Sequence, residues 1–457
     1  MKKVQSLKLI VPICLVLLLA TISLVTACAG NAPATSPTTA APKTSAAPPP
    51  TQTSSAPPQT SAAPPPPAPT SAPPTTAAPK PTQSPEPPGT LRIGFITGLT
   101  GWASIGTLHQ VRGAEIAVKM INEKGGVTVN GKPYKIELVT QDDKGTTDGS
   151  VAAVNKLVFD EKIKFIAGFP LWFLSASKSI TEPAKVLRSA VWTCCTPGEL
   201  GADTPYTFLC ASATLEQALA VLDYIKQTQP NIKTLACIYP DDGTPKYTGA
   251  TIKAMMDARG LSMAGDFILY PNDMSDFSPI AAKVQAIKAD AILQINGWGN
   301  HAAGILKNVR ELGDTRYYFG AVPTSAAEVM SMSGKDVATK FCCVAPMTGA
   351  PGNPPLLETV AKQLESADPG PLNQLALNGF DSVWVMLQAI RAAQSLDTTV
   401  VRDAWEKMKD IETSYGTSQM GSLKTYGINH AVNKPCSIQL LDNGQVKFGA
   451  WMSSVLP

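Results

Sequence analysis

The hydrophobic pattern of residues 91–126 changes its period once, and this change predicts a strand followed by a helix. Residues 91–96 are apolar apart from Arg92, as in a strand buried on both faces. A glycine-containing loop follows, and apolar residues then recur at helical spacing, at Val111, Ala114, Ala117, Val118 and Ile121. Such a loop, at the carboxyl end of a parallel strand, is where open α/β sheets bind small ligands.

The same alternation of strand and helix continues along the chain. Strand-like runs lie at 134–143, 163–170, 189–195, 234–239, 267–270, 291–296, 316–320 and 341–345, with amphipathic stretches between them. This alternation predicts an α/β protein with doubly wound parallel sheets. A seam near residues 210–214 divides it into two similar series, which predicts two lobes. Near the end, Asn443-Gly444 between two apolar runs predicts a hairpin.

The first residues have the pattern of a secretory signal. Lys2, Lys3 and Lys8 precede an apolar run at 9–25. The run ends in Val25-Thr26-Ala27-Cys28, which resembles a bacterial lipobox. We therefore expect residues 1–28 to be a lipoprotein signal peptide with its lipobox, and Cys28 to carry the lipid that anchors the chain to the membrane. An uncleaved membrane anchor is the alternative.

Residues 29–89 consist almost entirely of Pro, Ala, Thr and Ser. A segment of this composition cannot bury a hydrophobic core, so we predict a disordered, partly polyproline tether. Fully extended, it would span roughly 180 Å at about 3.1 Å per residue. Its Thr and Ser residues leave O-glycosylation open.

Charge and cysteine content exclude some functions and leave others open. The formal net charge is +3, which implies no nucleic-acid partner. Beyond Cys14 and Cys28, seven cysteines remain, mostly in apolar runs: Cys194, Cys195, Cys210, Cys237, Cys342, Cys343 and Cys436. We expect buried free thiols, although one or two disulfides are compatible with an oxidising compartment.

No motif for catalysis is present. The chain lacks a G-x-S-x-G elbow, a Walker A loop and an H-E-x-x-H pair, and its three histidines are far apart. Paired acids at 142–143 and 241–242 each end a strand. Metal binding or acid–base work is one interpretation of such pairs, and turn and helix-cap chemistry is the simpler one. We predict no enzyme activity, no metal and no cofactor.

Tryptophan is the more informative residue type. Trp102, Trp172 and Trp298 each follow a predicted strand, at positions that face the cleft of a two-lobed α/β protein. We expect these three rings to contact a ligand. Trp192 is open between ligand and core, whereas Trp384, Trp405 and Trp451 are expected in the core. Aromatic walls suit an aromatic ring, an apolar body or a quaternary ammonium.

Several stretches together resemble one family. They are IGFITGLTGWASIG at 93–106, RGAEIAVKMINEKGG at 112–126, IELVTQDD at 136–143, NKLVFDEKIKFIAG at 155–168, DFSPIAAKVQAIKADAILQINGWG at 276–299 and NGFDSVWVMLQAI at 378–390. The chain resembles the substrate-binding proteins of branched-chain amino acid ABC transporters, with the type I periplasmic-binding fold. The resemblance implies one domain, 90–457, with a hinged cleft. Its lobes would contain residues 90–210 with 346–428, and 211–345 with 429–457.

The resemblance carries over few ligand residues. Family members hold the amino-acid head group with hydroxyls after the third and fourth strands. Here Cys194 and Thr196 match the fourth-strand positions, and Thr244 lies near the position of a family tyrosine. The family's acid is replaced by Ala321-Val322-Pro323, which puts an α-amino acid ligand in doubt. With Ser104 in the first loop and Asn300 beside Trp298, these residues and the three tryptophans form the expected ligand site.

The sequence therefore predicts a monomeric, lipid-anchored extracytoplasmic protein that binds a small organic ligand and delivers it to an ABC permease in the membrane. The ligand would be an aromatic carboxylate, an amide or a cationic amine rather than leucine. A ligand-binding sensor for a signalling receptor is the alternative. An enzyme acting on cell-wall or amide substrates is a third possibility, which the absence of a nucleophile–base motif disfavours.

Overall fold

The computed structural model describes residues 88–169, 173–367 and 370–457. The signal peptide, Cys28, nearly all of the tether and Trp172 lie outside the described residues. Within these ranges, no helix is both long and apolar enough to cross a membrane.

The first sheet begins the folded part and is parallel at its centre. Its strand order is β13-β14-β15-β6-β5-β4-β1-β3-β2. The strands are β1 (Gly89–Thr97), β2 (Val127–Val129), β3 (Lys132–Asp142), β4 (Phe165–Gly168), β5 (Leu187–Ala190), β6 (Thr207–Leu209), β13 (Ile411–Thr413), β14 (Gly416–Gly421) and β15 (Ala431–Asn433). Strand β1 pairs in parallel with both β3 and β4, which places the strand before the first predicted loop in the interior of the sheet.

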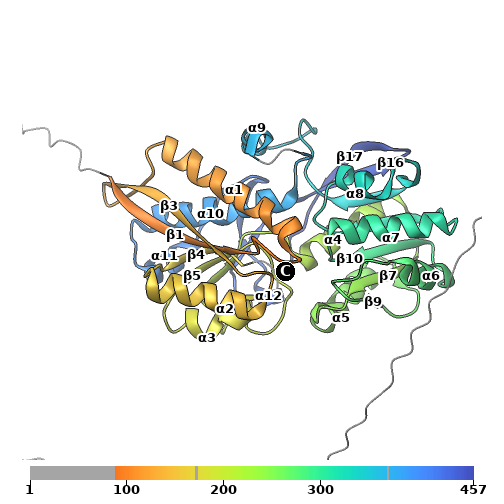
Figure 1. Ribbon diagram of the computed structural model, residues 1–457, viewed down its shortest axis with the longest axis horizontal. Helices are drawn as coiled ribbons and strands as arrows, with labels where there is room; N and C mark the ends of the chain where they lie inside the picture. Colours follow the sequence, from red (N-terminus) through yellow and green to blue (C-terminus); the bar gives the residue numbers. More distant parts are fainter. Residues whose placement is uncertain (1–87, 170–172, 368–369) are drawn as a thin grey trace, which may run out of the picture. The chain divides into compact units, whose positions relative to one another are not determined.

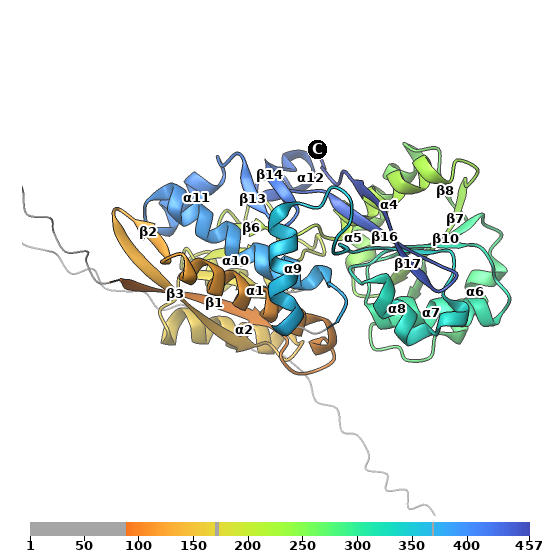
Figure 2. The same ribbon diagram turned by 90° about the horizontal axis from the view of Figure 1, so that it is seen from above.

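Helices cover both faces of this sheet (Figure 1). Helices α1 (Ser104–Glu123) and α10 (Gln374–Ala393) lie on one face, and α2 (Thr147–Asn155), η1 (Lys156–Asp160) and α3 (Phe173–Thr181) lie on the other. The side chains of β1 alternate accordingly, since Ile93 and Phe95 pack towards α1 while Ile96 packs towards α2. Helices α9 (Pro355–Ala367) and α11 (Thr398–Trp405) pack beside the pair of α1 and α10, and Figure 2 shows α9 next to α1.

The second sheet has the order β17-β16-β12-β11-β10-β7-β8, and β9 also pairs with β7. Its strands are β7 (Thr234–Pro240), β8 (Ser262–Met263), β9 (Ile268–Tyr270), β10 (Ala291–Ile295), β11 (Tyr317–Ala321), β12 (Phe341–Val344), β16 (Cys436–Asp442) and β17 (Gln445–Met452). Its helices are α4 (Thr214–Thr228), α5 (Thr244–Asp257), α6 (Ser278–Ala286), α7 (Gly299–Glu311) and α8 (Ala326–Ser333). The predicted α/β fold with two doubly wound lobes is therefore confirmed.

The chain passes between the two sheets three times. The passages follow β6, β12 and β15. The last lies between Asn433 and Cys436, because β15 pairs with β14 and β6 of the first sheet. The sequence placed this boundary a few residues earlier, at 428–429. It also missed the small strands β13 (IET), β14 (GTSQMG) and β15 (AVN), which contain too few apolar residues to show a strand pattern.

Three other local expectations have clear outcomes. The hairpin β16–β17 forms with Asn443 and Gly444 at positive φ, as the Asn-Gly pair predicts. All seven cysteines of the described chain are free, and only Cys195 is partly exposed, which confirms buried thiols there. The predicted strand at 189–195 ends early, since β5 stops at Ala190 and irregular backbone follows.

Helices α1 and α10 cross at two glycines. A β-carbon added to Gly113 would lie 2.7 Å from the carbonyl carbon of Ala376 and 2.8 Å from the amide nitrogen of Phe380. One added to Gly379 would lie 2.6 Å from the carbonyl carbon of Gln110. Because each clash is with backbone, neither helix can accommodate a side chain at the crossing without moving away from the other.

We expect Gly113→Ala to lower the free energy of unfolding by about 3 kcal/mol. The cost of overpacking this close contact exceeds the ~1 kcal/mol by which alanine stabilises a helix relative to glycine. Urea unfolding of residues 88–457 measures the change. Glu115→Ala, at an exposed position of the same helix, is the control and should change stability by less than about 0.5 kcal/mol. Equal stability of Gly113→Ala and wild type would contradict the tight crossing.

A buried carboxyl group lies at the first passage between the sheets. Glu216 of α4 accepts hydrogen bonds from the amide of Ala213 (3.1 Å) and from the hydroxyl of Tyr426 (2.7 Å). Glu216 thus returns its carboxylate to the amide of Ala213, the N-cap residue of α4. Burial raises the pKa of Glu216 to about 7.

This pKa makes stability depend on pH. Because the pKa of Glu216 is raised from its ordinary value of 4.5 to about 7, the folded state keeps a proton that the unfolded chain releases. The stabilisation is complete below pH ~4.5 and is lost as the pH rises through about 7. At ~1.4 kcal/mol per pKa unit, we expect Glu216→Gln to gain roughly 3 kcal/mol relative to wild type between pH 4.5 and 8. Measuring the free energy of unfolding at a series of pH values tests this expectation, with the exposed Glu115→Gln as control. If the free energies of Glu216→Gln and wild type changed in parallel with pH, the raised pKa would be refuted.

Candidate functional site

The loops that follow the parallel strands carry most of the predicted ligand residues. The loop between β1 and α1 carries Trp102, the loop between β10 and α7 carries Trp298, and Thr244 begins α5 directly after β7. Carboxyl ends of parallel strands are the usual ligand positions in open α/β sheets. The two lobes thus each contribute residues to one candidate site.

A cavity of about 530 Å³ lies where these loops meet. The first lobe contributes Trp102 and Ile105, and the second contributes the loop before α6 and one side of α7. The complete lining is Trp102, Ile105, Asn272, Asp273, Met274, Ser275, Asp276, Phe277, Trp298, Asn300, His301, Ala303, Gly304, Lys307, Asn308 and Met332. Three of the predicted residues, Trp102, Trp298 and Asn300, are therefore brought together. We call this space the tryptophan cavity.

The two tryptophans are in direct contact across it. Their ring centroids lie 5.9 Å apart with an interplanar angle of 85°, an edge-to-face arrangement. The indole N–H of Trp102 donates to the carbonyl of Gly145 (3.0 Å), while 41% of the residue remains exposed. Trp298 is the N-cap residue of α7 and follows Asn296 and Gly297, both at positive φ. This left-handed turn directs the backbone out of β10 and into α7.

The paired acids at the end of β3 hold the first loop in shape. The Asp142 carboxylate accepts hydrogen bonds from the amide of Leu99 (2.9 Å) and the hydroxyl of Thr100 (2.6 Å). Asp143 accepts from the amide of Gly145 (2.8 Å), and burial raises the pKa of Asp143 to about 6. Turn chemistry, the simpler of the two interpretations, is therefore confirmed for this pair, and it positions the loop that bears Trp102.

A second group of predicted residues meets deeper between the lobes. The amide of Thr244 donates to Asp242 (2.9 Å), and the side-chain amide of Asn296 donates to the other oxygen of Asp242 (3.2 Å). Burial raises the pKa of the Cys194 thiol well above its usual value; the Glu199 and Asp242 carboxylates raise it further, and the nearby Thr244 hydroxyl lowers it. We call Cys194, Thr196, Asp242 and Thr244 the inner polar group.

Glu199 holds the first-lobe part of this group. Its carboxylate accepts hydrogen bonds from the Thr193 hydroxyl (2.7 Å), the Cys194 amide (2.8 Å) and the Thr196 amide (3.3 Å). Within the described chain, four buried polar atoms of this region make no hydrogen bond of normal geometry: Trp192 Nε1, Thr196 Oγ1, Glu199 Oε1 and Thr244 Oγ1. Unsatisfied buried polar atoms of this kind are places where polar groups of a ligand or water are accommodated.

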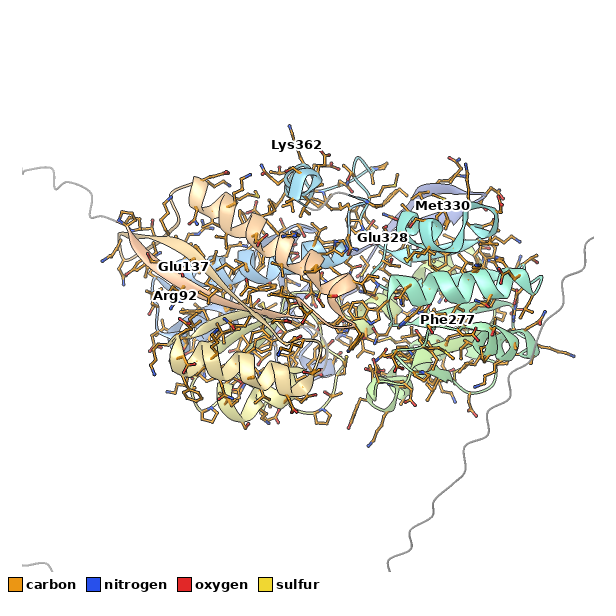
Figure 3. The ribbon with its side chains drawn as sticks, in the orientation of Figure 1. Arg92, Glu137, Phe277, Glu328, Met330 and Lys362 are labelled. Carbon is orange, nitrogen blue, oxygen red and sulfur yellow. The ribbon has the colours of Figure 1, made fainter. Side chains whose placement is uncertain are left out.

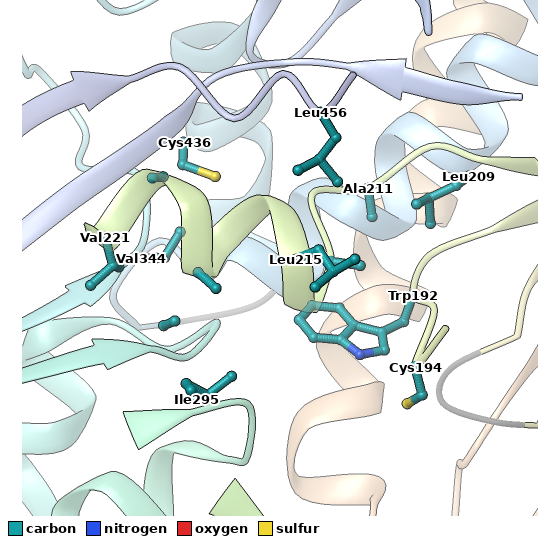
Figure 4. Close-up of a cluster of buried hydrophobic side chains, with 14 of the residues drawn as sticks. Trp192, Cys194, Leu209, Ala211, Leu215, Val221, Ile295, Val344, Cys436 and Leu456 are labelled. Carbon is teal, nitrogen blue, oxygen red and sulfur yellow. The ribbon is translucent and has the colours of Figure 1, made fainter. Parts of the chain in front are cut away.

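The remaining predicted residues have other surroundings. The Ser104 hydroxyl donates to the carbonyl of Gly101 (2.8 Å), and Ser104 is not among the residues that line the tryptophan cavity. Trp192 is 4% exposed and packs in a hydrophobic cluster near Leu215 and Cys194 (Figure 4). Trp384 and Trp405 are buried as expected, whereas Trp451 is partly exposed.

The structure adds residues that the sequence did not indicate. Phe277, labelled in Figure 3, and His301 form part of the cavity wall. The ring of His301 contacts the Tyr270 hydroxyl (3.2 Å) and the Asn272 carbonyl (3.0 Å), and burial lowers the pKa of His301 to about 4. It is therefore neutral near pH 7 and supports the loop of residues 272–276. Among the described residues no three His, Cys, Asp or Glu side chains form a metal-binding group.

Comparisons with known proteins agree with this architecture. A family model described as "Periplasmic binding protein" matches residues 90–445. The Leu/Ile/Val-binding protein homolog 3 of Brucella melitensis is 25% identical over 343 residues, covering 73% of this chain and 89% of its own length. The branched-chain amino acid substrate-binding protein LivJ of Streptococcus pneumoniae, solved with isoleucine, has a TM-score of 0.66 at 19% identity, covering 80% of this chain and 99% of its own.

A solute-binding protein of an ABC transporter from Rhodopseudomonas palustris, solved with benzoate, has a TM-score of 0.65 at 15% identity, covering 81% of this chain and 98% of its own. All three are described as binding proteins. Since the family model matches most of its length, the chain belongs to the periplasmic binding protein family.

Proposed function

We propose that this chain is a lipid-anchored, extracytoplasmic solute-binding protein that captures a small aromatic carboxylate in the tryptophan cavity and delivers it to an ABC permease. The observation that carries the proposal is the edge-to-face pair of Trp102 and Trp298, one from each lobe, on the wall of a cavity of about 530 Å³. A ligand held by both rings would couple its own binding to the approach of the lobes.

The cavity has the groups that an aromatic carboxylate needs. Trp102, Trp298 and Phe277 supply ring faces and edges, each aromatic contact being worth about 0.5–1.5 kcal/mol beyond burial. Helix α7 begins at this cavity, and its N-cap residue, Trp298, provides no side-chain acceptor for the first amides. Those amides are suited to a carboxylate, and Lys307 of the same helix supplies an ammonium group at the wall.

The other ligand classes are supported by fewer groups. Asp273 and Asp276 also line the cavity and would suit a cationic amine stacked on the tryptophans. For a leucine-type ligand, Thr196 matches the family pattern, but the position of the family's acid is occupied by Ala321-Val322-Pro323. Solved neighbours contain isoleucine or benzoate, so the fold accommodates both, and the ring contacts favour the aromatic acid.

With the carboxylate at the start of α7, the inner polar group would hold a further polar substituent of the ligand, or the water around it. Thr196 and Cys194 come from the first lobe and Thr244 from the second, so this group, like the tryptophan cavity, involves both lobes. We propose contacts from Thr196 and Thr244 because their hydroxyls are buried without hydrogen-bond partners of normal geometry in the described structure.

A ligand panel tests the proposal. We expect tryptophan fluorescence and calorimetry to detect benzoate binding to residues 88–457, and Trp298→Ala to weaken it about tenfold, which corresponds to ~1.4 kcal/mol. Trp451→Phe, at a residue that does not line the tryptophan cavity, is the matched control and should bind as wild type does. The panel also contains benzamide, benzyltrimethylammonium and leucine. Micromolar binding of leucine without any binding of aromatic acids would overturn the aromatic proposal.

The lipid anchor is tested separately. We expect the full-length chain, expressed in a bacterium, to enter the detergent phase on Triton X-114 partitioning, because a diacylated Cys28 holds it in the membrane. Cys28→Ser should move the processed protein to the aqueous phase or leave the signal uncleaved, and Cys14→Ser is the control. Wild-type protein that is cleaved but found wholly in the aqueous phase would rule out lipidation.

A further inference from the structure

The indole of Trp298 reaches from the second lobe to the surface of α1 in the first. A β-carbon added to Gly106 would lie 2.8 Å from Cε3 of this indole and closer still to Cζ3. It would also lie 3.0 Å from Cδ1 of Leu375 on α10. The six-membered ring of Trp298 therefore occupies the space that a side chain at position 106 would need. We call the space bounded by Gly106, Trp102 and Leu375 the indole slot.

The backbone itself does not require glycine at this position. Gly106 is the third residue of α1 and is absent from the residues with positive φ, so alanine would fit its conformation. Glycine in a helix costs about 0.5–1 kcal/mol relative to alanine. The requirement thus comes from space: the ring from the opposite lobe can approach α1 only where there is no side chain.

A second contact between the lobes lies one turn further along α1. The imidazole Nε2 of His109 lies 3.8 Å from Oε1 of Glu328 on α8, labelled in Figure 3. The side-chain amide of Asn373, the N-cap residue of α10, also donates to Glu328 (3.0 Å and 3.2 Å). Gly106 and His109 are three residues apart and so share a face of the helix. This face of α1 is where the second lobe docks.

We infer that Gly106 is a positioning residue for ligand capture: it forms the slot that receives Trp298 when the lobes close, and so places the ring that walls the tryptophan cavity. Gly106 itself need not touch the ligand. The inference deepens the proposed function and depends on it for the ligand, but the slot can be tested without one. With the slot filled, closure would be incomplete and bound ligand would dissociate faster, while association would change little.

The test without ligand uses 5-fluorotryptophan incorporated into residues 88–457, with ¹⁹F NMR signals assigned by single Trp→Phe variants. We expect Gly106→Ala to shift the Trp298 and Trp102 signals and raise their solvent sensitivity, while those of Trp384 and Trp405 stay unchanged. The control, Glu115→Ala on the same helix, should move none of the four. An unchanged Trp298 signal in a folded Gly106→Ala protein would refute the slot.

A rescue experiment adds the kinetic readout, with benzoate as the probe. We expect Gly106→Ala to raise the dissociation rate about tenfold, equivalent to ~1.4 kcal/mol, with the association rate changed less than about twofold. Adding Trp298→Phe, whose ring is smaller, should lower the dissociation rate of the Gly106→Ala protein part of the way back. The effects of the two substitutions would then be non-additive. Strict additivity would count against the slot. Absence of benzoate binding to wild type would refute the proposed ligand class, and the ¹⁹F result would still decide the role of Gly106.

Discussion

The close packing of α1 against its neighbours is the constraint on which the rest of the structure depends. At Gly113 its backbone touches that of α10, and this contact joins the first helix of the first lobe to a helix that follows more than 250 residues later. Because interiors are packed to crystal-like density, a helix held this closely has one position. Its amino-terminal end is therefore fixed too, and that end carries the loop with Trp102 and the slot at Gly106.

Most of the fold follows from local signals in the sequence. The change from an apolar run to helical spacing after residue 96 places β1 and α1 correctly, and the Asn443-Gly444 pair places the last hairpin. The short strands β13, β14 and β15 could not be predicted, because they contain few apolar residues and their pairing depends on the fold around them. The last boundary between the lobes was placed too early for the same reason, because β15 was not recognised as part of the first lobe.

The candidate site was predictable only in part. A large ring in a loop after a strand is a local signal, and it identified Trp102 and Trp298 as cavity residues. Phe277 was missed because its stretch reads as a helix start, and its position at the cavity depends on the fold of the second lobe. The role of Gly106 has no sequence signal, since glycine near a helix start is ordinary until the ring from the other lobe is seen against it.

The two parts of the site are mechanically linked through one short turn. Asn296 donates to Asp242 in the inner polar group, and Trp298, two residues later, contributes the ring in the tryptophan cavity. Positive φ at Asn296 and Gly297 fixes the direction between them. A displacement of Trp298 would therefore also displace the side chain of Asn296 and, through their hydrogen bond, Asp242. Thr244 would be affected too, because its amide donates to the same carboxylate. Binding of a ligand's ring at Trp298 and of a polar substituent at the inner polar group would then both depend on one event, the docking of the second lobe on α1.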